Sequence, residues 1–229
     1  KPIAPENDRY LGDEMAASIE IIYTLELPVC PVTCVEVSYL LWGEGRCLVR
    51  VNYQGKKGLP ELPVLGWRMM SPTPADGFTY QGLSGETYPD RRDGAQAGIF
   101  HVEGMPVSRY MVPQECGMHV ETDWVRIQRS TSLDETPTGD EVVSRKRCGV
   151  SELEIHKVDG TFGFSCLPYT AHELEHAQHH EDLPPLRRMV LSICGEVRGV
   201  GGINSWGADV EAPYHISGEK DHSFAFLIQ

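Results

Sequence analysis

The chain has 229 residues, of which 41% are hydrophobic, and this is enough to bury the core of a single domain. Its formal net charge is -13 and its longest basic run is Arg145-Lys146-Arg147, so a nucleic acid partner is excluded, because phosphate binding needs a clustered basic face. No apolar run has the length of a membrane span, and residues 1–5 lack the apolar core of a signal peptide. We therefore expect a cytoplasmic protein with no membrane partner.

The dominant hydrophobic period along the chain is two, with Gly, Pro, Asn or Asp between the runs, and this pattern predicts β-strands. We expect strands at residues 18–27, 33–41, 47–53, 64–70, 124–129, 153–157, 189–193 and 223–228. The turn signal at residues 42–45 predicts a hairpin between two of them. Pro and Gly recur every few positions in residues 71–117, where long ordered loops are expected instead of regular strands. Residues 134–140 are the best candidate for a flexible loop.

The seven cysteines lie at positions 30, 34, 47, 116, 148, 166 and 194. None of them has the two-residue spacing of a redox or zinc pair. We interpret them as free thiols in a reducing compartment.

One segment breaks the β pattern. Thr170 and Glu173 have the spacing of a capping box, in which the hydroxyl and the carboxylate satisfy free amides at a helix start. Two prolines at positions 184 and 185 close the run. These signals predict a short helix at residues 171–180.

That helix contains His172-Glu-Leu-Glu-His176, which matches the H-E-x-x-H pattern of zinc peptidases. A zinc peptidase also needs a third protein ligand and a longer, buried helix, and Glu173 already has a structural explanation as the capping residue. We therefore interpret the segment as a solvated helix and expect no metal site in this chain.

Charged residues gather around a Tyr-Pro turn in the middle of the chain. They are Glu86, Asp90, Arg91 and Arg92. We interpret them as ties that hold a loop through ion pairs and backbone hydrogen bonds. Glu115 and His119 resemble an acid and a base, but they lack a nucleophile or ligand spacing, so a hydrogen-bonded loop is the simpler interpretation.

The stretch at residues 198–209, RGVGGINSWGAD, concentrates glycines just before a single large aromatic side chain. Glycines permit a tight turn and the close approach of a backbone or a ligand. A Trp on such a turn offers a flat amphipathic face for stacking. Alternatively, Trp206 fills the core beneath its own turn, because Trp is highly buried on average. The residues alone leave both interpretations open.

Four motifs follow one another in an order and at a spacing that resemble a known family. They are GETYPDR at residues 85–91, VPQECGMH at 112–119, FGFSCLPY at 162–169 and GGINSWG at 201–207. Over most of the chain from about Ser18 they resemble the small chain of the family 2 β-galactosidases. That small chain is either the C-terminal domain of a long enzyme or a separate subunit beside a large catalytic one. The amino-acid sequence at residues 55–63 and 83–91 is most similar to that of the small subunit of the heterodimeric enzymes.

The resemblance implies an all-β fold, a large antiparallel β-sandwich of the galactose mutarotase type, or supersandwich, with one short helix. We expect a single domain over residues 1–229. It also implies part of a β-galactosidase that hydrolyses terminal β-galactosides such as lactose. In that family the two catalytic glutamates and the magnesium and sodium sites belong to a (β/α)₈ barrel. Nothing in this chain alternates strand and helix as a barrel requires, so we expect no catalytic residue and no cofactor in it.

The family's small chain lends the active site one tryptophan, which stacks on the aglycone or acceptor sugar, and that position matches Trp206. The turn that supports this platform consists of Gly199, Gly201, Gly202, Asn204, Ser205 and Gly207. A flat aromatic ring excludes water from one face of a sugar without demanding a particular hydroxyl pattern. We therefore expect Trp206 on an exposed or partner-facing turn.

Two other classes of protein stay open. A stand-alone carbohydrate-binding module also presents a Trp on a loop, but it usually needs several coplanar aromatic side chains. A mutarotase-like enzyme on the same fold needs a paired His and Glu in a cleft. The family's small chain also usually begins with further strands and an Asp-Asn-Asp motif. Residues 6–8 match that motif weakly, which leaves open whether the sandwich includes its N-terminal strands.

Overall fold

The computed structural model describes residues 17–133 and 145–229, which form an all-β fold with one short helix, as predicted. The strands are β1 (Ser18–Leu27), β2 (Thr33–Trp42), β3 (Cys47–Tyr53), β4 (Val64–Ser71), β5 (Gly77–Leu83), β6 (Ala97–Glu103), β7 (His119–Thr122), β8 (Trp124–Leu133), β9 (Arg145–Lys157), β10 (Phe162–Leu167), β11 (Met189–Val197) and β12 (His222–Ile228). The helical segments are α1 (Ala171–His176) and the 3₁₀ turns η2 (His180–Asp182) and η3 (Ala212–Tyr214). Within these ranges, no helix is long and apolar enough to cross a membrane.

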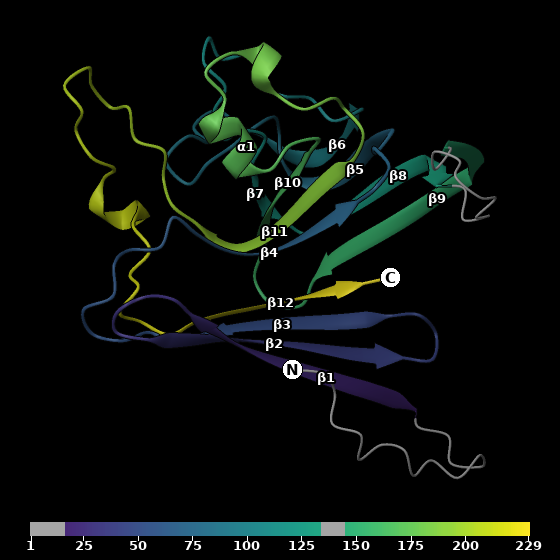
Figure 1. Ribbon diagram of the computed structural model, residues 1–229, viewed down its shortest axis with the longest axis horizontal. Helices are drawn as coiled ribbons and strands as arrows, with labels where there is room; N and C mark the ends of the chain where they lie inside the picture. The colour runs from purple at the N-terminus through teal and green to yellow at the C-terminus, as the bar shows by residue number, and fades with distance from the viewer. Residues whose placement is uncertain (1–16, 134–144) are drawn as a thin grey trace.

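The strands form two antiparallel sheets. The larger sheet has eight strands in the order β1-β2-β3-β12-β9-β8-β5-β6, and the smaller has four in the order β4-β11-β10-β7. In Figure 1 the larger sheet curves from β1 at the bottom, past β9 and β8 at the right, to β5 and β6 at the top. The smaller sheet lies inside this curve. The predicted antiparallel sandwich is therefore confirmed.

The main core lies between the sheets and is built from alternate side chains. In β3, Val49, Val51 and Tyr53 are buried, whereas Arg50 between them is exposed, because successive side chains of a strand point to opposite faces. The largest fully buried side chains are aromatic: Phe78, Tyr80, Phe164 and Phe226. The ring of Phe164 packs edge to face against those of Phe78 and Tyr80, with centroids 5.4 Å apart in each pair, which is an arrangement that aromatic rings prefer.

The predicted strands are all present, and several are longer than expected, β9 most of all. The predicted hairpin is also present, since the amide of Gly45 donates to the carbonyl of Trp42 at 3.0 Å and joins β2 to β3. The flexible loop expected at residues 134–140 lies outside the described residues. The six cysteines whose side chains the structure describes are free, and the side chain of Cys148 is outside them.

The prediction of long ordered loops at residues 71–117 is wrong over β5 and β6. The glycines there allow strands to approach one another closely and do not break them. A Cβ at Gly77 would lie 2.5 Å from the carbonyl oxygen of Val102, and one at Gly82 would lie 3.1 Å from Oγ1 of Thr122. Two more strands, β7 and β10, were also not predicted from the sequence. Neither shows an alternating hydrophobic pattern, because β7 has only four residues and all residues of β10 are buried.

The capping box predicted at the start of α1 is confirmed. Oγ1 of Thr170 accepts a hydrogen bond from the amide of Glu173 at 3.2 Å, and the carboxylate of Glu173 accepts one from the amide of Thr170 at 2.9 Å. The helix packs its single buried residue, Leu174, against Cys116 and Leu167. Glu173 therefore has a structural role at the helix start.

The predicted end of this helix at residue 180 is wrong, because α1 ends at His176. The carboxylate of Asp182 accepts hydrogen bonds from the amides of Gln178 and His179 at 3.1 and 2.9 Å. A side chain that bonds these amides offers the backbone an alternative to continuing the helix. The chain therefore starts a separate 3₁₀ turn, η2, in place of a further helical turn.

β1 is an edge strand, and among the described residues it pairs only with β2. Its side chains continue the apolar inner face of the larger sheet, but Ile19, Tyr23 and Leu25 are exposed there. An apolar groove of about 540 Å³ runs along β1 and β2 on this face. One margin of the sandwich is thus apolar and open to water.

Candidate functional site

Trp206 lies on a loop that leaves the end of β11 and returns at η3, projecting from the body at the upper left of Figure 1. Its side chain is 92% exposed. The interpretation of Trp206 as a core residue is therefore wrong, and the expectation of an exposed or partner-facing turn is confirmed. Two further apolar side chains of the loop, Val200 and Ile203, are also exposed.

Asn204 shapes the tip of this loop. Its side-chain oxygen accepts hydrogen bonds from the amides of Trp206 at 2.9 Å and Ala208 at 3.3 Å, which is an Asn-supported turn. Gly207 follows with a φ of 74°, and Ser205 is exposed. The predicted turn residues are therefore brought together around the backbone of Trp206, and the ring itself is left without a neighbour to cover it.

Asp90 anchors the start of the loop. Its two carboxylate oxygens accept hydrogen bonds from the amides of Val200 at 2.9 Å and Gly201 at 2.7 Å. Gly199 makes room for this contact, because a Cβ there would lie 2.8 Å from Cγ of Asp90. Gly201 and Gly202 then turn the chain with φ values of 68° and 69°, which side chains other than glycine rarely adopt. We call these contacts the Asp90 anchor.

The charged residues next to Asp90 also act as ties. Arg91 donates to the carbonyl of Gly201, and Arg92 forms an ion pair with Glu121. Glu86 accepts a hydrogen bond from the hydroxyl of Ser108, on a separate loop. The interpretation of this cluster as loop ties through ion pairs and backbone hydrogen bonds is confirmed.

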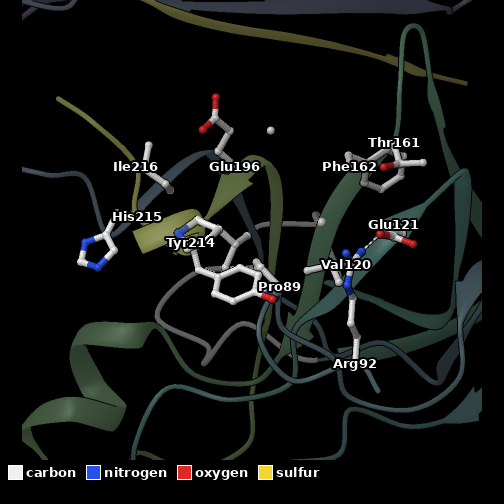
Figure 2. A pocket seen from close by; sticks show the side chains of 14 residues that line it. Pro89, Arg92, Val120, Glu121, Thr161, Phe162, Glu196, Tyr214, His215 and Ile216 are labelled. Carbon is white, nitrogen blue, oxygen red and sulfur yellow. Dashed lines mark ion pairs between the residues drawn. The ribbon is translucent and has the colours of Figure 1, made fainter. Parts of the chain in front are cut away.

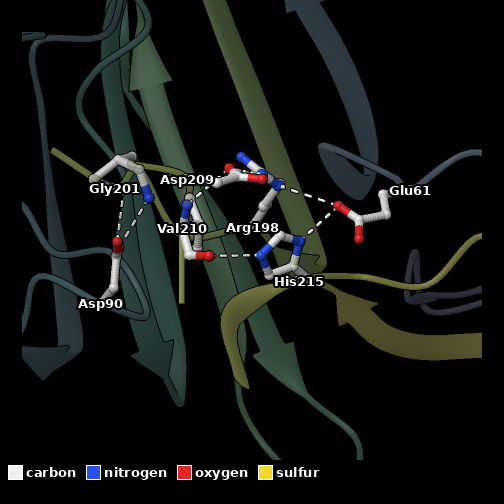
Figure 3. Close-up of polar contacts among 8 residues, drawn as sticks. Glu61, Asp90, Arg198, Gly201, Asp209, Val210 and His215 are labelled. Atoms are coloured by element: carbon white, nitrogen blue, oxygen red, sulfur yellow. Dashed lines mark hydrogen bonds and ion pairs between the residues drawn. The ribbon is translucent and has the colours of Figure 1, made fainter. Parts of the chain in front are cut away.

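A second anchor, made of Arg198, Asp209, His215 and Glu61, holds the base of the loop (Figure 3). Arg198 and Asp209 pair at 2.6 Å, and His215 contacts Glu61 through Nδ1 at 2.6 Å and the carbonyl of Val210 through Nε2 at 2.7 Å. Both partners of the imidazole are acceptors, so both bonds form only when the ring is protonated. The Glu61 hydrogen bond accordingly raises the pKa of His215, and the Arg198 hydrogen bond lowers the pKa of Asp209.

Among the described residues a His–Glu pair, as a mutarotase-like enzyme would need, occurs three times, and in two of them both ring nitrogens of the histidine are engaged. Nδ1 of His222 contacts Glu196 at 2.5 Å and its Nε2 contacts the carbonyl of Ser217 at 2.7 Å. His215 is held in the same way by Glu61 and a carbonyl. A general acid or base needs a ring nitrogen within reach of the substrate. Neither of these two pairs therefore supports mutarotase-like chemistry. In the third pair, Nε2 of His156 lies 2.9 Å from the carboxylate of Glu154, which is also bound by Arg126.

Two polar groups of the H-E-x-x-H segment are engaged. The carboxylate of Glu173 is held by Thr170 and by Arg188, and Nδ1 of His176 lies 2.8 Å from the carbonyl oxygen of His172. Over residues 17–133 and 145–229, no group of three or more His, Cys, Asp or Glu side chains is placed to hold a metal ion. That the protein carries no zinc remains a prediction.

Glu115 and His119 are not brought together. His119 lies on β7 with its ring stacked on Phe164 at a centroid distance of 4.9 Å, and burial lowers its pKa to about 4. Glu115 lies beside α1, where its amide donates to the carboxylate of Glu175 at 2.9 Å, and partial desolvation of its carboxyl group raises its pKa. The two residues therefore do not form an acid–base pair.

The family model of the β-galactosidase small chain matches residues 6–228. The chain belongs to this family. This small chain is 52% identical over 232 residues to a β-galactosidase small subunit of Latilactobacillus sakei, covering 99% of this chain and 69% of that protein. It is 32% identical over 222 residues to a β-galactosidase of Halalkalibacterium halodurans, covering 94% of this chain but only 20% of that protein. The predicted resemblance to the small subunit is confirmed.

Among solved structures, the small chain aligns with a candidate aldose 1-epimerase of Escherichia coli K12 at a TM-score of 0.39 and 12% identity, covering 94% of this chain and 66% of that one. A TM-score this low supports no conclusion about the fold or the function of the small chain. The all-β class rests instead on the strands and sheet order of the small chain itself.

Sequence reasoning missed the second anchor of the small chain. Arg198 and Asp209 carry opposite charges at the two ends of the glycine-rich stretch, and this was the one local signal for a closed loop base. His215 and Glu61 had no such signal, because they lie 154 residues apart in the chain and meet only through the fold.

Proposed function

We propose that this small chain is the non-catalytic small subunit, or C-terminal domain, of a β-galactosidase that hydrolyses terminal β-galactosides such as lactose. Its partner is the catalytic barrel subunit or domain, which supplies the catalytic carboxylates and the metal sites. The small chain completes the active site with Trp206, whose ring stacks on the aglycone of the galactoside. The family membership and the 52% identity to a β-galactosidase small subunit support this proposal.

The observation that carries the role of Trp206 is its 92% exposure on a loop that is anchored at both ends. A large apolar ring left in water gains free energy when a ligand or partner covers it. The two anchors hold the loop backbone, so the ring is presented outward instead of collapsing onto the sandwich. An amphipathic ring in this position suits the apolar face of a sugar.

The carboxylates near the loop serve as anchors and not as reactants. A retaining glycosidase needs two carboxyl groups about 5 to 5.5 Å apart, one as acid/base and one as nucleophile. Asp90 is bound to two amides, Asp209 to Arg198, and Glu61 to His215. Engaged in this way, they hold the loop, and we infer that the reaction takes place on carboxylates of the partner.

The first test is reconstitution. The purified small chain alone is expected not to cleave nitrophenyl β-galactoside, whereas a mixture with its large subunit is expected to be active. A mock purification from cells without the gene controls for host β-galactosidase. Robust turnover by the small chain alone would contradict the proposal.

The second test is Trp206→Ala in the reconstituted enzyme. Stacking on an aromatic ring contributes about 1–3 kcal/mol in nucleic acid complexes, which corresponds to about 5- to 150-fold weaker binding of lactose and of acceptor glucose. Trp206→Phe keeps a flat ring and should lose less. Ile203→Ala removes another exposed apolar side chain of the same loop and serves as the matched control.

Inhibition by galactose should change little in Trp206→Ala, because we place galactose against the catalytic partner. Equal weakening of glucose and galactose binding in this variant, or an equal effect of Ile203→Ala, would contradict a stacking role for the ring.

A further inference from the structure

A polar hollow of about 260 Å³ lies at the root of the Trp206 loop (Figure 2). Its walls come from segments that are far apart in the sequence, and they include Pro89, Arg92, Glu121, Thr161, Glu196 and Tyr214. Figure 2 shows Glu196 above Tyr214 and the Arg92–Glu121 ion pair to its right. Glu121 lies on β7, Thr161 directly before β10 and Glu196 on β11, and these three strands are neighbours in the smaller sheet.

The backbone around this hollow is irregular in three places. Glu121 has a φ of 55°, and it is the one positive-φ residue other than glycine in the described part of the chain. The register of β11 shifts between Cys194 and Glu196, and that of β10 with β7 shifts between Phe162 and Phe164. Bulges redirect side chains, and strained backbone persists where the surrounding structure holds it. Their convergence on one hollow points to a built site.

The polar side chains of the hollow retain hydrogen-bonding capacity. The hydroxyls of Thr161 and Tyr214 have no hydrogen-bond partner among the described residues. Glu196 uses one carboxylate oxygen on His222, and the other is left for a ligand. The ion pair of Arg92 and Glu121 has side chains that are 43% and 45% exposed, so both can also contact a bound molecule. The hollow therefore offers donors and acceptors side by side.

The charges and walls of the hollow select the class of ligand. Each carboxylate is matched by a cation, since Glu121 pairs with Arg92 and Glu196 with His222, so neither an anion nor a metal ion is favoured. The chain's net charge of -13 also disfavours an anion. Buried Phe162 and Ile216 add apolar wall beside the polar groups. The volume of the hollow, about 260 Å³, is below the range of about 300–1,000 Å³ that is typical of sites for drug-sized ligands, which favours a smaller ligand.

We propose that this hollow binds a neutral monosaccharide in its pyranose form, at a site separate from Trp206. Ring hydroxyls would exchange hydrogen bonds with Tyr214, Thr161 and the charged pairs, and the apolar sugar face would lie on the apolar wall. The site belongs to the small chain alone and does not depend on the catalytic partner. It also adjoins the loop, because the carbonyl of Tyr214 accepts a hydrogen bond from the amide of Gly199 at 3.0 Å.

The test is a titration of the full chain with galactose and with glucose, followed by amide NMR shifts, with inorganic phosphate as an anion control. We expect saturable shifts at Glu121, Thr161 and Tyr214 in the millimolar range, and none with phosphate. Tyr214→Phe and Thr161→Val each remove one hydroxyl and should weaken binding by about 2- to 10-fold, the range for a single hydrogen bond. Trp206→Ala should leave the affinity unchanged.

Three results would overturn the proposal: no saturable shift with either sugar, equal affinity in the wild type and both hydroxyl variants, or loss of binding in Trp206→Ala. The last result would assign the sugar to the loop and would leave the proposed aglycone role intact. Conversely, sugar binding at the hollow would stand even if reconstitution with a large subunit failed.

Discussion

The Asp90 anchor predicts how far the Trp206 loop opens when one carboxylate is removed. Asp90→Ala deletes hydrogen bonds of 2.9 and 2.7 Å to two consecutive amides, those of Val200 and Gly201. A hydrogen bond to a charged group contributes about 1.5–3 kcal/mol. Asp90 is half-buried and Val200 is exposed, so we discount for solvent and expect about 1–3 kcal/mol for the two bonds together. The population of the open loop should therefore rise about 5- to 150-fold.

Amide hydrogen exchange measures this opening residue by residue. In Asp90→Ala the amides of Val200 and Gly201 should exchange faster by that factor, whereas Phe164 and Ile193 in the core should keep their protection. Asp90→Asn keeps one acceptor oxygen and should fall between the wild type and Asp90→Ala.

Asp93→Ala is the matched control, because Asp93 is exposed nearby and makes no hydrogen bond or ion pair with the described residues. Unchanged exchange at Val200 and Gly201 in Asp90→Ala would refute the anchoring role. A uniform rise across the core would do so as well, because it would show that Asp90 stabilises the whole fold instead of the loop.

Three further predictions concern stability. Trp206→Ala should change the free energy of unfolding by less than about 0.5 kcal/mol, since a buried Trp would cost about 3–5 kcal/mol, and urea denaturation distinguishes the two. His172→Ala with His176→Ala should leave the melting temperature nearly unchanged, and elemental analysis should find no stoichiometric zinc; one zinc per chain would revive the metal-site hypothesis. Burial lowers the pKa of His222, but its carbonyl and carboxylate acceptors outweigh burial and leave that pKa raised above 6.5. The stabilisation is therefore complete below pH 6.5 and lost as the pH rises through the folded-state pKa, so the deficit of His222→Gln in urea denaturation should shrink with rising pH, and a growing deficit would contradict this assignment.

Local chemistry in the sequence predicted those features whose partners are close in the chain. The capping box of Thr170 and Glu173 and the hairpin at Gly45 each involve residues within one turn, so their residue types suffice to predict them. The exposure of Trp206 was a different case. Its glycine-rich surroundings fitted a loop platform and a core turn equally well, and the family resemblance favoured the platform.

The features that escaped prediction depend on contacts between distant segments. In the sequence, Gly77 and Gly82 look like residues that interrupt a strand. In the structure they lie within a strand, where a neighbouring segment leaves no room for a side chain. The early end of α1 depends on Asp182, whose carboxylate bonds amides that the helical pattern assigned to the helix. The hollow that we propose as a monosaccharide site joins residues from Pro89 to Tyr214, and no local motif contains all of them.

One margin of β1 is unpaired among the residues that the structure describes, and we expect ionic strength to govern the colloidal behaviour of the purified chain. Like charges keep molecules of net charge -13 apart at low salt, but the screening length falls to about 8 Å at 0.15 M. The free amides and carbonyls of an apolar edge strand are then a template for another chain. Light scattering should rise with added salt, and Leu25→Lys should suppress that rise. If scattering stays flat at all salt concentrations, Glu20 and Glu26 on β1 are sufficient to protect the edge.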